Sequence, residues 1–123
     1  MAVSRKTAAA ASVRRSPAAP EFADHWELSD LVTDPVAQFD RYLKDLSAKV
    51  SRFESARADL TATMPEQAFL NLLTLSEQIA RDSGRLGAYA YLWFSEDTKQ
   101  LQARSFKTKV EEHLTALQNH LLF

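Results

Sequence analysis

The chain contains no cysteine among its 123 residues. Disulfide bonds, thiolate chemistry and Cys-ligated zinc sites are therefore excluded. Glycine and proline are scarce, with 2 and 4 residues, and the abundance of alanine, leucine and charged straight-chain residues favours helix. No apolar run approaches the roughly 20 residues that a membrane-spanning helix needs. These absences predict a soluble, all-α chain, and they suit the reducing cytoplasm.

Acidic residues are missing from the N-terminus. Four of the 15 basic residues and none of the 16 acidic ones lie in residues 1–20, so residues 21–123 carry a net charge near −5. A mildly acidic charge over residues 21–123 is not typical of a nucleic-acid-binding protein, which usually carries a basic surface. Residues 1–20 are rich in Ala, Arg and Pro, and we interpret them as a disordered tail. An organelle transit peptide and a twin-arginine export signal at Arg14-Arg15 are the alternatives.

The first expected structural elements follow this tail. Residues 21–33 show no long period, and Trp26 with its spaced leucines indicates a short segment docked against a core. A long helix is expected from Asp34-Pro35, because Asp caps free amides and Pro has no amide to lose. Steps of mostly three and four residues then predict one apolar stripe, made of Val36, Phe39, Leu43, Leu46, Val50, Phe53 and Leu60.

The second expected helix has a stronger start signal. Thr63-Met64-Pro65-Glu66 fits a capping box, in which Thr63 and Glu66 each cover an amide of the first turn. Two glycines sit inside this helix, which suggests a surface of small residues where another helix packs closely; its members are Ala80, Ser83, Gly84, Gly87 and Ala88. The predicted stripe comprises Phe69, Leu72, Leu73, Ser76, Ile79, Ser83, Leu86, Ala90 and Trp93.

A polar link at Ser95-Glu96-Asp97-Thr98 separates the second helix from a third. The third helix is expected to present Leu101, Phe106, Val110, Leu114, Leu117 and Leu121. Short links favour antiparallel neighbours, so we predict three long antiparallel amphipathic helices in an up-down-up arrangement. Leu121-Leu122-Phe123 is apolar and in helical register, so we expect it to pack into a groove or to continue into a longer protein.

No catalytic, cofactor-binding or metal-binding residue is predicted in this chain. His113 and His120 are two turns apart on one helix, about 10.5 Å along its axis, too far to share one zinc ion. The third histidine, His25, stands alone. The sequence also lacks a His-Glu-x-x-His motif, a Gly-rich phosphate loop and a Gly-x-Ser-x-Gly elbow.

The remaining charged and aromatic candidates have ordinary structural interpretations. Glu111-Glu112 are adjacent and point to different parts of a helix surface. Arginines of such helices usually cover apolar stripes or pair with acids, and this applies to Arg81, Arg85 and Arg104. The aromatic cluster Tyr89, Tyr91, Trp93 and Phe94 occupies more than one helix face, which predicts burial on more than one side and a partner beyond three helices.

Two segments resemble the N-terminal region of the oligoendopeptidase F family of zinc metallopeptidases. Trp26-Glu27-Leu28-Ser29-Asp30-Leu31 is similar to the family's Trp-Asp-Leu-Ser-Asp-Leu opening. The second segment, Arg85–Leu92 followed by Phe94–Thr98, is similar in sequence and spacing to a later N-terminal segment of the family. Glu27 departs from the usual Asp or Asn, a Gly-Lys element is missing near Phe53–Leu60, and the family's His-Glu-x-x-His lies downstream of anything present here.

The resemblance implies that residues 21–123 are a non-catalytic helical domain, truncated before the catalytic domain. Family members hydrolyse short peptides inside an enclosed channel, with zinc held in the C-terminal half and a motif Glu that activates water. The N-terminal helices would form part of the channel wall, with the missing catalytic domain as their partner, and this chain alone is expected to be inactive. A self-contained helical protein-protein interaction module is the alternative, and no membrane or nucleic-acid partner is expected.

Overall fold

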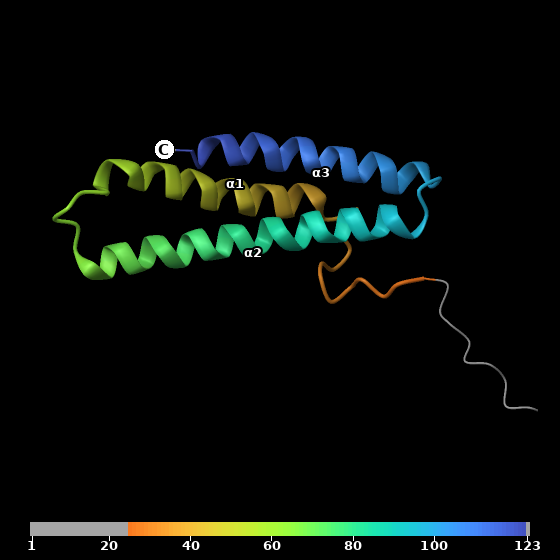
Figure 1. The fold of residues 1–123 in the computed structure, drawn as a ribbon, viewed down its shortest axis with the longest axis horizontal. Helices are drawn as coiled ribbons and strands as arrows, with labels where there is room; N and C mark the ends of the chain where they lie inside the picture. The colour runs from red at the N-terminus through yellow and green to blue at the C-terminus, as the bar shows by residue number, and fades with distance from the viewer. Residues whose placement is uncertain (1–24, 123) are drawn as a thin grey trace, which may run out of the picture.

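The computed structural model describes residues 25–122, which are entirely helix, turn and loop. Three α-helices, α1 (Phe39–Ser55), α2 (Glu66–Glu96) and α3 (Leu101–His120), follow a non-helical segment at 25–38, and a short 3-10 helix, η1 (Ala56–Asp59), extends α1. The helices run side by side, and each is antiparallel to the one before it in the chain (Figure 1). The predicted all-α, up-down-up fold is confirmed. The expected tail at 1–20 lies outside the described residues, as does Phe123.

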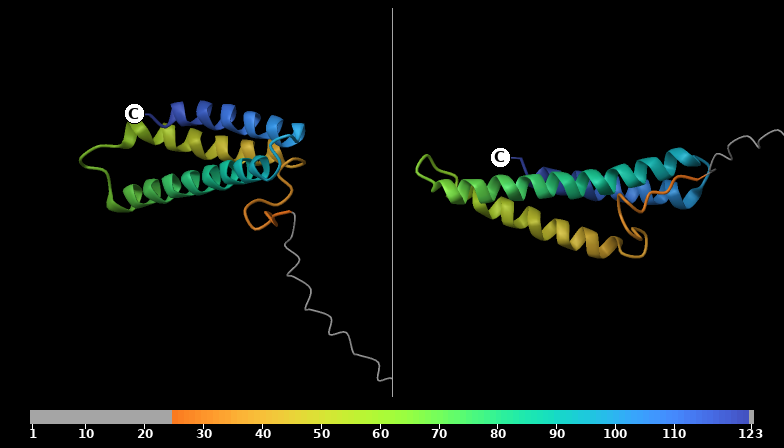
Figure 2. Two further views of the ribbon diagram at one scale, coloured as in Figure 1. Left: turned by 45° about the vertical axis from the view of Figure 1, so that its right-hand side comes forward. Right: turned by 90° about the horizontal axis from the view of Figure 1, so that it is seen from below.

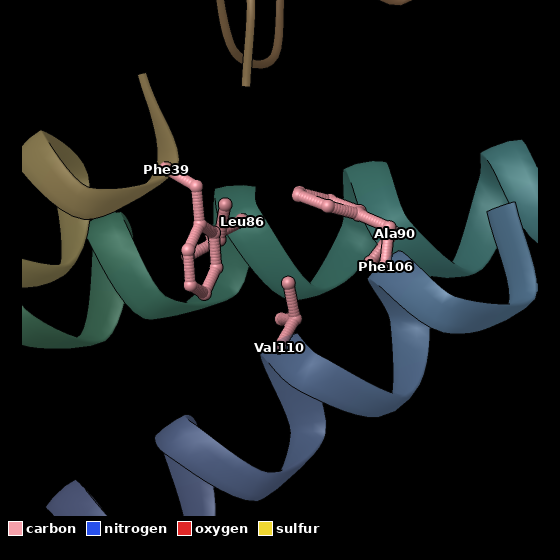
Figure 3. Packing of buried hydrophobic residues seen from close by; sticks show 5 residues of the cluster. All are labelled: Phe39, Leu86, Ala90, Phe106 and Val110. Carbon is pink, nitrogen blue, oxygen red and sulfur yellow. The ribbon is translucent and has the colours of Figure 1, made fainter. Parts of the chain in front are cut away.

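The helices meet in two groups of buried side chains. The first comprises Phe39, Leu86, Ala90, Phe106 and Val110, and the second Leu46, Val50 and Ile79. In the first group the side chains of all three helices converge (Figure 3). Leu114 packs against both groups, so the apolar interior is continuous along the bundle. All of these residues belong to the predicted stripes, because a period near 3.6 residues places them on one face of each helix.

The first helix begins later than the sequence indicates. Asp34 has a φ of 46° and the α-helix starts only at Phe39, preceded by a turn in which the Gln38 N–H donates to the Asp34 carbonyl oxygen at 3.0 Å. Asp tolerates this left-handed conformation better than most residues. The chain therefore changes direction at the position where we expected a helix cap, and Val36, an expected stripe residue, is exposed.

The predicted capping box of α2 is not formed. Glu66 is the first helical residue and Pro65 stands at the N-cap with no side-chain capping bond. A capping box needs Thr at the N-cap and Glu three residues into the helix, so Thr63 lies too early, and its Oγ1 instead lies 3.2 Å from that of Thr61. The other end of α2 extends through Glu96, which moves the link to 97–100.

α2 is much longer than its neighbours. Its 31 residues correspond to about 46 Å, against 17 residues in α1 and 20 in α3. A Cβ built on Gly87 would lie 3.6 Å from Cδ1 of Leu114, so the last residues of α3 lie level with about residue 81 of α2. The N-terminal part of α2 therefore extends beyond α3, and the left view of Figure 2 shows α1 diverging from this part as well.

Candidate functional site

The start of the segment 25–38 is attached to the bundle through one carboxylate. Oε1 of Glu96, the last residue of α2, accepts a hydrogen bond from the Trp26 N–H at 2.9 Å and lies 2.8 Å from His25 Nδ1. The Glu96 side chain is 16% exposed, whereas that of His25 is 87% exposed. Hydrogen bonds to an ionised acceptor are stronger than neutral ones. Glu96 is therefore the main polar attachment of the start of this segment, a role the sequence analysis missed when it assigned this residue to a link.

Further contacts fix the rest of the segment. Val32 and Pro35 are buried, and the Tyr42 hydroxyl of α1 donates to the Thr33 carbonyl oxygen at 2.8 Å. The Glu27 carboxylate accepts hydrogen bonds from the side chain and the backbone N–H of Ser29, which lower the pKa of Glu27 below its usual value. The segment is thus a structured element held by α1 and α2, as predicted. Its expected aromatic contact is wrong, because Trp26 is 53% exposed and the buried side chains are those of Val32 and Pro35.

Two grooves flank this segment. One, of about 390 Å³, lies between residues 26–36 and the C-terminal end of α2, including Tyr89 and Trp93. The other, of about 380 Å³, lies between residues 29–33 and the middle of α1 and α2. It contains an ion pair between Lys49 Nζ and Asp82 Oδ2, which joins α1 to α2 and has no signature in the sequence. The two segments that carry the family resemblance line both grooves together.

Removing the Glu96 carboxylate should release the start of the segment. Hydrogen bonds to charged groups contribute about 1.5–3 kcal/mol, so in Glu96→Ala we expect hydrogen exchange of the Trp26 amide to accelerate by about tenfold or more. Exchange in the middle of α2 should stay unchanged. Glu111→Ala, which removes an exposed carboxylate paired with Lys107, is the matched control. Unchanged protection of Trp26 in Glu96→Ala would refute the attachment.

Tyr89 is the titratable aromatic residue of this region. Burial, and then the negative charges of Asp34, Glu96 and Glu27, raise the pKa of its phenol above the usual 10.0. Its ring packs against Phe106 and Trp93, with centroids 6.0 Å away in each case. The phenol is therefore held in its neutral form by the surroundings that also bury its ring.

This shift predicts an alkaline loss of stability. Because the folded-state pKa of Tyr89 is raised, the folded protein binds more protons than the unfolded chain above about pH 10, and stability falls as pH rises there. Tyr89→Phe keeps the ring and removes the titration, so the difference in urea midpoint between variant and wild type should grow in favour of the variant above pH 10. Parallel pH profiles of the two proteins would contradict the prediction.

The histidines do not converge. His113 Nδ1 lies 2.7 Å from the Lys109 carbonyl oxygen and its ring packs edge-on against Phe39. His120 lies 3.4 Å from Glu54, and His25 is at Glu96. Among residues 25–122, no group of three or more His, Asp or Glu side chains is placed to hold a metal ion. Each histidine makes its own contact with a neighbouring residue, and the three side chains do not meet at one site.

The predicted charged candidates also lie apart. Arg81, Arg85 and Arg104 are all exposed, on two different helices. Arg85 lines the groove beside Asp82, whereas Arg104 lies on the outer face of α3. Glu111 pairs with Lys107 at 2.6 Å, and Glu112 is exposed beside it. In the described part of the chain these groups do not form a nucleophile, base and stabiliser in one place.

The aromatic cluster divides between the core and the surface. Tyr89 and Trp93 pack around Phe106, and Phe94 lies beneath the Lys107 ammonium, 5.4 Å from its ring centroid. Tyr91 is 61% exposed. Three helices thus bury most of the cluster but leave the face that carries Tyr91 uncovered. Exposed apolar side chains also occur near the start of α2, at Phe69, Leu70 and Leu73.

The small-residue surface of α2 is covered only in part. Gly87 faces Leu114, but a Cβ on Gly84 would meet no atom within 4 Å. Next to Gly84 a groove of about 480 Å³ opens between α2 and the end of α3, with Phe53 and Val50 of α1 also lining it. The close helix contact that we predicted therefore exists at Gly87 and is absent at Gly84.

The described residues thus form a three-helix bundle with a docked N-terminal segment and an open apolar groove. No helix in residues 25–122 is both long and apolar enough to cross a membrane. In comparisons with known proteins, no family model, no curated protein and no solved structure matches this chain.

Proposed function

We propose that this chain is the non-catalytic N-terminal helical part of a zinc metallo-oligopeptidase of the oligoendopeptidase F type. What supports the proposal is the junction at Glu96. The two segments whose sequences resemble that family are about 60 residues apart in the chain, yet the Trp26 N–H of the first donates to the Glu96 carboxylate of the second. The contact brings the two segments together, with a backbone N–H from the first and a carboxylate from the second.

In this proposal the bundle forms part of the wall of a peptide channel. Long antiparallel helices with a continuous core provide a rigid wall, and the exposed apolar residues of α2 provide a surface for a neighbouring domain. Zinc and its activating glutamate would be supplied by the catalytic domain, because residues 25–122 offer no cluster of ligands for a metal ion. The compartment implied by the resemblance is the cytoplasm.

Two measurements test this function. The purified chain should neither cleave a quenched-fluorescent peptide in the presence of zinc nor retain stoichiometric zinc; zinc-dependent cleavage would refute the non-catalytic role. The coding sequence after codon 123 tests the family: an in-frame His-Glu-x-x-His motif supports it, whereas a stop codon directly after codon 123 contradicts it.

A self-contained interaction module is the second candidate function. The observation that favours it is the exposure of Phe69, Leu70 and Leu73, each more than 40% accessible on consecutive turns of α2. A contiguous apolar surface of this kind is typical of a protein-binding site. The stop codon just described, together with a stably folded chain, would favour this function over the first.

A further inference from the structure

The groove between the docked segment and the C-terminal end of α2 carries charges of one sign. Its volume is about 390 Å³, and the charged residues that line it are Glu27, Asp34 and Glu96, with no Lys or Arg among them. Two of these carboxylates belong to the docked segment, and the third is on the last residue of α2. A cleft lined by charges of one sign concentrates the field and attracts ions of the opposite sign.

Aromatic rings line the same groove. Trp26 is 53% exposed, and Tyr89 and Trp93 are half-buried on consecutive turns of α2. A cation that lies over the face of such a ring is attracted by its π-electrons, most strongly over tryptophan. The groove therefore combines the two kinds of group, carboxylates and aromatic rings, that proteins use to bind organic cations.

The three carboxylates are poorly compensated by the rest of the described chain. Glu96 lies 2.8 Å from the imidazole of His25, but none of the three pairs with a Lys or Arg of residues 25–122. All three raise the pKa of the Tyr89 phenol, so their charges act on the same place. Like charges that share a site repel each other, and a bound cation removes that repulsion. In this part of the chain no group of three or more His, Asp or Glu is placed to hold a metal ion, so the cation that matches the groove is an organic one.

We propose that this groove binds the arginine side chain of a separate peptide. A guanidinium group is planar and always charged, stacks on aromatic rings and donates hydrogen bonds to carboxylates. Trp26 supplies an exposed ring for stacking, and Glu27 and Asp34 supply exposed carboxylates. A lysine ammonium has no planar face to stack, so the combination favours arginine. The inference does not depend on the peptidase proposal.

Intrinsic fluorescence measures the binding, because both tryptophans of the chain line the groove. An Arg-Arg dipeptide blocked at both ends should change the emission of the 123-residue chain saturably, with a Kd on the order of 1 mM at low salt. Salt at about 0.5 M should weaken this binding, because it screens exposed charges. The matching citrulline dipeptide has a similar shape without the charge and should give no saturable change. Equal responses to the two dipeptides, or no saturation by Arg-Arg up to about 10 mM, would overturn the proposal.

Charge removal tests the carboxylates. Asp34→Asn and Glu27→Gln should each weaken binding of the Arg-Arg dipeptide about threefold, as expected for one exposed ion pair. Asn tolerates the φ of 46° at position 34, so the urea midpoint of Asp34→Asn should equal or exceed that of the wild type while its affinity falls. Glu112→Gln removes an exposed carboxylate on the outer face of α3; this control should keep the wild-type Kd. Wild-type affinity in both groove variants would overturn the proposal.

A variant of the basic N-terminus tests the source of the arginine. Arg14 and Arg15 belong to the same chain, and an internal ligand competes at a high effective concentration. The variant Arg14→Gln/Arg15→Gln should bind the Arg-Arg dipeptide with the wild-type Kd, to within about twofold. Binding that is tighter by about tenfold or more would show that the chain's own arginines fill the groove, and would overturn its assignment to a separate peptide.

Discussion

Phe106→Ala should destabilise the fold by about 3–5 kcal/mol, the range measured for deleting a buried aromatic side chain. Phe106 is 7% exposed, and its ring centroid lies 5.6 Å from that of Phe39 and 5.7 Å from that of Trp93. One substitution therefore removes a contact shared by all three helices. The free energy of unfolding from urea titration, followed by circular dichroism, measures the effect.

The control for this variant is on the same helix. Leu101→Ala removes an apolar side chain that is 76% exposed, and exposed substitutions usually change stability by about 0.5 kcal/mol or less. If the two variants lost similar amounts of stability, the aromatic residues around Phe106 would not form a packed core.

Leu46→Ala should cost about 2–5 kcal/mol, the range for deleting a buried aliphatic side chain. Leu46 is 2% exposed and forms the second buried group with Val50 and Ile79. The cavity would lie in the second buried group, two helical turns of α1 from Phe39, so amide exchange in α1 should accelerate with the loss of stability. Leu60→Ala, at a leucine that is 46% exposed, should cost under about 1 kcal/mol. Equal losses for the two variants would refute the second buried group.

The helical pattern predicted the interior well. The stripe positions Phe39, Leu46 and Val50 of α1 are buried, as are Ile79 and Leu86 of α2. The prediction is wrong for Phe69 and Leu73, which are exposed on the part of α2 that extends beyond α3. Helical periodicity determines which residues share a face, and the apolar members of that face leave water. Periodicity does not determine where a helix starts or ends, and for this reason Val36 and Leu60, at the two ends of the first predicted stripe, are exposed.

The burial of small residues could not be predicted from the sequence pattern. Ala103 is completely buried, with an exposed fraction of 0%, yet it was not among the predicted stripe residues of the third helix, whereas Leu101 was and is exposed. An alanine is buried when a neighbouring helix approaches closely, and that approach depends on both helices. The same reason separates Gly87, which α3 covers, from Gly84, which it does not.

The sequence predicted single features of the candidate site, but not the contacts that join them. The docking of residues around Trp26 was predicted, but the Trp26 side chain expected to make the contact is 53% exposed. The polar partner Glu96 was assigned to a link, because nothing in the sequence separates the last turn of α2 from the link that follows it. The Lys49–Asp82 ion pair joins residues more than 30 positions apart, and many such pairs of opposite charge exist in any helical chain.

The sequence by itself determined the fold class, the three helices and the apolar face of each, because periodicity and helix propensity are local properties of the chain. It also predicted that α2, with aromatic residues on more than one face, needs more cover than two neighbours supply. Only the tertiary structure decided which part of α2 stays open. That depends on where α3 ends relative to Arg81 and on the small volume of Ala80 and Gly84, and both become visible only when the helices are placed side by side.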